Sequence, residues 1–107
     1  MSEAANCLTL TACIAELESL RYTPAGIPAL NLKLEHASSV IEAGQQRQIK
    51  AAMKAVALGA MAERLAGQAT GSTWKFNGFL ATPRNGKHVV FHIQEFLQYA
   101  DLQDQEV

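Results

Sequence analysis

The segment Arg21–His36 constrains the fold more than any other part of this 107-residue chain. Pro24 and Gly26 are typical of a turn, because proline fixes φ and glycine adopts positive φ without steric cost. Pro28 lacks a backbone donor and is therefore expected at the entrance of a strand. After it, leucine alternates with other residues up to Leu34, a period-two pattern that buries one face of a strand. The segment predicts a proline-bracketed loop followed by a half-buried strand.

Length and composition indicate one globular domain. The chain has 49% hydrophobic and 18% charged residues, which is enough apolar material for one core, and it is too short for two domains. The formal net charge is −1, but residues 19–94 carry all nine Lys and Arg residues against only Glu35, Glu42 and Glu63. The middle of the chain is therefore locally basic, which permits an anionic partner without requiring one.

Signals for secretion, membranes, metals and catalysis are missing from the sequence. The N-terminus lacks the basic and apolar regions of a signal peptide, and no apolar run approaches the ~18 residues of a membrane helix. Cys7 and Cys13 are expected roughly 20 Å apart along one strand, at about 3.3 Å per residue, so they cannot bridge each other. The sequence has no cysteine–histidine grouping of a metal site and no P-loop, HExxH or nucleophile elbow. We expect a soluble, cytoplasmic protein without cofactor, metal or enzymatic activity.

Alternating and breaker patterns predict five strands and one helix. The first strand begins near Leu8, and its phase changes between Ile14 and Leu17, which suits a β-bulge. Residues 36–44 are expected to form a long connecting loop or a hairpin rather than a helix. The last two strands flank Asn85-Gly86, a dipeptide typical of a hairpin turn. In the first of these two strands, Trp74 and Phe76 are expected in the core.

Residues 45–58 fit two structures. Their alanine content favours a helix that continues through Leu65. Period-two alternation instead places Ile49, Met53 and three alanines on one face of a strand, and we favour this interpretation. Gly59 then interrupts the pattern, and residues 60–66 are predicted as a short helix that ends at Gly67. The expected order of elements is β-β-β-α-β-β.

This order is the signature of an OB-fold, an all-β, five-stranded Greek-key barrel that we expect to span residues 1–107, with an acidic tail at about residues 100–107. OB-folds bind oligonucleotides on strands two and three and on the loops that join strands one to two and four to five. Here these loops are residues 21–28 and 82–87. The candidate nucleic-acid-binding residues lie in these loops, at their ends and on strand three: Arg21, Tyr22, Arg47, Lys50, Lys54, Arg84, Lys87 and His88.

Several short segments carry a family resemblance: Thr23–Pro28, Leu34–His36, Glu42–Gly44 with Arg47-Gln48, Gly71-Ser72 and Gly78-Phe79. They are similar to primosomal replication protein N, the PriB family, and the similarity covers nearly the whole chain. The resemblance implies a homodimer of OB-folds, related to single-stranded DNA-binding proteins, that acts in replication restart. It implies binding to single-stranded DNA together with a PriA-type helicase and transfer to a DnaT-type primosomal protein. It also implies DNA-binding roles for Arg21, Arg47 and the loop before His88.

The chain departs from this family on strand three, where Gln45 and Lys50 stand in place of exposed aromatic residues. Glu16 also occupies a position where a basic residue is expected. Because base stacking contributes roughly 1–3 kcal/mol per base, we predict weak and mainly electrostatic DNA binding. Phe79 and Tyr22 are the aromatic candidates for a contact surface. The alternative function is a protein-interaction adaptor of the primosome with little intrinsic DNA binding. A short single-stranded DNA-binding protein is disfavoured, because the sequence ends almost at the last expected strand, without a long Gly/Gln-rich linker and an acidic-hydrophobic tip.

Overall fold

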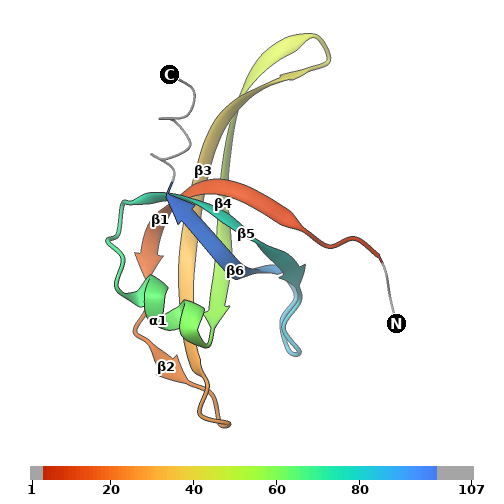
Figure 1. Cartoon of the computed structure of the whole chain (residues 1–107). Helices are drawn as coiled ribbons and strands as arrows, with labels where there is room; N and C mark the ends of the chain where they lie inside the picture. The colour runs from red at the N-terminus through yellow and green to blue at the C-terminus, as the bar shows by residue number, and fades with distance from the viewer. Residues whose placement is uncertain (1–3, 99–107) are drawn as a thin grey trace.

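The computed structural model describes residues 4–98, so the expected acidic tail lies outside the described residues. The elements are β1 (Leu8–Leu17), β2 (Arg21–Tyr22), β3 (Pro28–Glu42), β4 (Gln45–Leu58), α1 (Ala60–Ala66), β5 (Thr73–Ala81) and β6 (Val90–Gln98) (Figure 1). The strand order is β1-β5-β6-β4-β3-β2, and a further pairing of β1 with β3 closes five strands into a barrel. With α1 between the third and fourth barrel strands, this is the OB-fold predicted from the sequence. The short β2 is an addition within the loop predicted at residues 21–28.

β1 bends so that it pairs with two neighbours. Its first part pairs with β5, and its last part pairs with β3 through Glu16↔Lys33 and Leu17↔Leu32. The register shifts between Ile14 and Glu16, which confirms the predicted bulge. A bulge bends a strand locally, and here it lets one strand join both sides of the barrel.

β3 and β4 form a long antiparallel hairpin whose tip extends beyond the barrel (Figure 1). Its turn consists of Ala43 and Gly44, with φ values of 54° and 78°, as a tight type I′ turn requires. The strand prediction for residues 45–58 and the hairpin alternative for residues 36–44 are therefore confirmed. The helix and long-loop alternatives are wrong, because burial of the alternating face outweighs the helix propensity of alanine.

The core fills the barrel and continues beneath α1. Its largest fully buried side chains come from five elements: Ile14, Leu30, Leu34, Leu65, Phe76 and Phe91. Trp74 is half-buried and packs its ring edge-to-face against Phe96, with 4.9 Å between centroids. The core position predicted for Phe76 is thus confirmed, whereas Trp74 packs against the edge of the core. The predicted helix is also confirmed, and its last turn is capped by the N–H groups of Gly67 and Gln68, which donate to the carbonyl oxygens of Arg64 and Leu65.

Three further observations on residues 4–98 concern membrane spans, disulfides and metal sites, which the sequence analysis also considered. The one helix described, α1, falls well short of the length and apolarity needed to cross a membrane. Both cysteines are free. Within the described range, histidine, cysteine and acidic side chains form no group of three suited to a metal ion.

Candidate nucleic-acid interface

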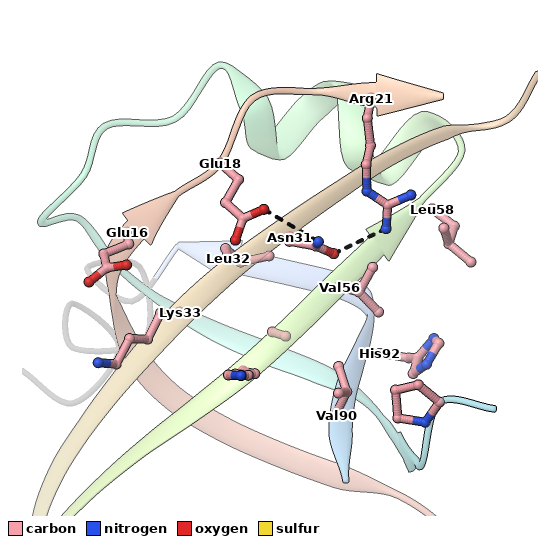
Figure 2. A pocket seen from close by; sticks show the side chains of 13 residues that line it. Glu16, Glu18, Arg21, Asn31, Leu32, Lys33, Val56, Leu58, Val90 and His92 are labelled. Carbon is pink, nitrogen blue, oxygen red and sulfur yellow. Dashed lines mark hydrogen bonds between the residues drawn. The ribbon is translucent and has the colours of Figure 1, made fainter. Parts of the chain in front are cut away.

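A groove of about 550 Å³ lies on the outer face of β3, β4 and β6 (Figure 2). It arises because Asn31 and Lys33 of β3 and Lys54, Val56 and Leu58 of β4 point away from the core, whereas their neighbours Leu30, Leu32, Leu34, Ala55 and Ala57 are buried. The residues that line it are Glu16, Glu18, Arg21, Asn31, Leu32, Lys33, Lys54, Ala55, Val56, Leu58, Pro83, Val90 and His92. The groove therefore combines the strand face with both loops that the sequence predicted would contribute.

Two lysines face each other across the groove surface. Lys33 of β3 and Lys54 of β4 are direct partners in the antiparallel register. Like charges placed directly opposite each other on neighbouring strands are destabilising. Glu16 lies opposite Lys33 on its other side, in β1. The row Glu16–Lys33–Lys54 thus carries one acid and two bases across three strands, and an anion close to Lys54 would relieve the repulsion.

A chain of hydrogen bonds fixes the arginine at the rim of the groove. Arg21 donates from Nη2 to Oδ1 of Asn31 at 3.3 Å, and Asn31 donates from Nδ2 to Oε1 of Glu18 at 3.4 Å. Asn31 therefore stands between the guanidinium and the carboxylate (Figure 2). Because a guanidinium has five N–H donors, this single bond orients Arg21 and leaves donors for a phosphate or carboxylate ligand.

An aromatic pair adjoins the groove on the side of β6. Phe79 of β5 and His92 of β6 are cross-strand partners, and their rings stack with centroids 4.8 Å apart and planes 11° apart. His92 also lines the groove, next to Val56 of β4 in the parallel register. Figure 2 shows Arg21 and Asn31 on one side of β4 and His92 on the other.

Of the predicted site residues, the structure brings Arg21 and Lys54 together in the groove. Tyr22 lies on β2 with 61% of its surface exposed. Arg84, Lys87 and His88 are exposed in the loop between β5 and β6, whose Pro83 reaches the groove.

The other two predicted residues lie elsewhere on the hairpin. Arg47 is near its tip and forms an ion pair with Glu42. Lys50 lines a second hollow of about 500 Å³, together with Cys13, Glu35 and His36. Neither residue lines the groove.

The sequence reasoning missed Asn31, Lys33 and His92. A signal existed for the first two, because the leucine alternation of β3 already placed them on the solvent face. His92 also alternates with buried residues, but its place beside β4 depends on a parallel strand pairing that no local pattern predicts.

Comparisons with known proteins show the family and the fold of this chain. The sequence model of a protein family, described as "Another single-strand binding protein family", matches residues 6–95. Replication restart protein PriB of Bordetella pertussis is 43% identical over 91 residues, which are 84% of this chain and 85% of that protein. The PriB protein of Nitrosomonas europaea is 35% identical over 91 residues, 84% of each chain.

Solved structures give the same result. PriB from Ralstonia solanacearum has a TM-score of 0.82 and 38% identity, over 90% of this chain and 99% of that one. A single-stranded DNA binding protein from Thermus aquaticus has a TM-score of 0.70 at 22% identity, over 89% of this chain and 51% of that one. The second likeness concerns the fold alone.

Proposed function

This chain belongs to the PriB family of replication restart proteins, and we propose that its groove binds single-stranded DNA within the replication-restart primosome. The observation that carries the proposal is the Lys33–Lys54 pair above an apolar floor. A phosphate beside these lysines offsets their mutual repulsion, and the floor accepts the apolar parts of a nucleotide.

We assign the charged contacts to three places. Arg21 and the two groove lysines contact phosphates along β3 and β4. Arg84 and Lys87, with His88, contact the strand from the loop between β5 and β6. Lys50 and Arg47 continue the contact along the hairpin, where the Glu42 carboxylate offsets the charge of Arg47. Glu16 and Glu18 oppose phosphate binding in the groove, so the electrostatic part of the affinity is expected to be small.

We further propose that the protein acts as a cytoplasmic homodimer that stimulates or tethers a PriA-type helicase and acts with a DnaT-type protein, without catalytic activity of its own. The resemblance to the PriB family supports these partners. The alternative is an adaptor that binds these proteins and has little affinity for DNA. The two groove carboxylates favour this alternative, because they offset two of the three cations that line the groove.

The test is a fluorescence anisotropy titration with a labelled single strand of about 30 nucleotides, a length that exceeds one OB-fold site. Replacing Lys33 and Lys54 together by Gln is expected to weaken DNA binding and to leave binding of a purified PriA-type helicase intact. The matched control is Lys75→Gln, which removes a lysine of β5 that does not line the groove. If the double variant binds DNA with unchanged affinity, the groove is not the DNA-binding site. Helicase binding by a wild-type protein that binds no DNA would establish the adaptor.

A further inference from the structure

We propose that His92, supported by Phe79, is a stacking platform for one nucleobase of the bound strand. The inference rests on the proposed DNA-binding function and identifies a base contact within the same groove. This base contact lies on β5 and β6, where a stacked pair takes the place of the aromatic residues that β4 lacks.

The two rings are held as a preformed stack. Phe79 and His92 are partners across the β5–β6 ladder, and their planes differ by only 11°. Phe79 therefore covers one face of the imidazole. His92 also lines the groove, so part of its half-buried side chain faces the ligand space. Both residues are half-buried, so a base that stacks there meets side chains whose freedom is already restricted.

The backbone around Gly78 holds the pair in place. The β5–β6 register shifts between Asn77 and Gly78. At Gly78 the two strands approach so closely that an added Cβ would lie 2.9 Å from the carbonyl carbon of His92 and from Cε1 of Phe91. Such contacts are well inside the 3.5–4.0 Å at which carbon atoms pack. Only glycine permits this approach, which fixes the backbone that carries the imidazole.

The surroundings of His92 fit a nucleotide better than a side chain of a protein partner. The groove is lined by apolar Val56, the partner of His92 across the β4–β6 pairing, by Val90 and by the cations Lys54 and Arg21, and Figure 2 shows Arg21 across β4 from His92. Single-stranded DNA alternates planar bases with phosphates, so one nucleotide stacks while its neighbours meet the cations. Every base has a π-face, and the platform is therefore expected to be tolerant of sequence.

The experiment compares two labelled oligonucleotides of equal length, one of thymidines and one of abasic residues. His92→Ala is expected to weaken binding of the thymidine strand about 5-fold to 150-fold, the equivalent of roughly 1–3 kcal/mol for one stacked base. It is expected to leave the abasic strand unaffected, because phosphate contacts remain. His92→Phe keeps a stacking face and is expected to restore affinity for thymidine. Phe79→Leu is expected to give a partial loss with the same selectivity.

His36→Ala is the matched control, since it removes a half-buried imidazole of β3 that does not line the groove. Equal losses for both oligonucleotides, or none, in His92→Ala would overturn the platform. A loss of helicase binding with unchanged DNA affinity would overturn it too and assign His92 to a protein partner. Wild-type protein that binds neither strand would instead overturn the proposed function, and the platform with it.

Discussion

Replacing Gly78 by alanine tests the close approach of β5 and β6. The added methyl group would lie 2.9 Å from a backbone carbon of His92 and from the ring of Phe91, which is fully buried. The first of these atoms belongs to a paired strand and the second to the core, so neither can rotate out of the way. Restoring ordinary carbon contacts of about 3.5–4.0 Å already requires a separation of about 0.6–1 Å. The carbonyl oxygen of His92 would lie closer still to the added methyl group, so the two strands must separate by more than this.

The expected cost follows from this displacement. Overpacking a core position costs about 1–3 kcal/mol, and weakening a neighbouring ladder hydrogen bond adds about 0.5–1.5 kcal/mol. We therefore expect Gly78→Ala to lower the free energy of unfolding by about 1.5–4.5 kcal/mol. For a domain of this size, each kcal/mol corresponds to about 4–8 °C, so Tm is expected to fall by about 6–36 °C. Wild-type stability of about 5–15 kcal/mol leaves the variant folded under native conditions.

Urea unfolding followed by the fluorescence of Trp74, the single tryptophan, measures this cost. Gly67→Ala is the matched control, because its added Cβ would lie 3.7 Å from the nearest atom and its φ of −87° suits any residue. The control is expected to lower the free energy of unfolding by no more than about 0.5 kcal/mol. If Gly78→Ala unfolds at the same urea concentration as wild type, the close approach of the strands is refuted.

Three further changes test the turn and the groove. Ala43→Asn is expected to stabilise the protein by about 0.5–1 kcal/mol in urea unfolding, because Ala43 has a φ of 54° and asparagine tolerates this conformation better; a lower stability would contradict the I′ turn. Lys54→Gln is expected to reduce the slope of log K against log salt by about 0.7 between 50 and 200 mM salt, equally for all base sequences; an unchanged slope would remove Lys54 from the phosphate contacts. Glu16→Gln and Glu18→Gln are each expected to raise DNA affinity at low salt and less so at high salt, as measured by anisotropy; a decrease would show that these carboxylates support the site.

The sequence predicts most of the fold because the direction of side chains in strands depends on local alternation. The leucines of β3 and the slip after Ile14 identify a half-buried strand and a bulge, and both are present. The secondary structure of residues 45–58 is harder to predict from the sequence, since alanine is a good helix former and is also small enough for a crowded barrel wall. Burial of Ala55 and Ala57 against the barrel core decides the matter, and burial is a property of the whole fold.

The sequence predicts the site in part, because the fold that it predicts also indicates where ligands bind. Arg21 and Lys54 follow from the OB-fold arrangement, and both line the groove. The lysine pair requires the register of β3 and β4, and the position of His92 requires the parallel pairing of β4 with β6. Such long-range pairings are set by the closure of the barrel. The absence of aromatic residues from β4 therefore leaves another aromatic candidate in the fold, because the stacked pair of Phe79 and His92 lies on β5 and β6.

The parallel seam between β4 and β6 has a consequence for the motions of the barrel. In the described part of the chain, these strands pair only at Ala55↔Phe91 and Val56↔His92, whereas β3–β4 and β5–β6 pair along most of their length. A short ladder opens at a lower free energy than a long one, so amide protons at this seam are expected to exchange early. The groove lies across the seam, with side chains from both strands in its walls. A DNA strand bound in the groove would therefore bridge β4 and β6. Its first effect on hydrogen exchange is expected as slower exchange of the amide protons in the β4–β6 pairing.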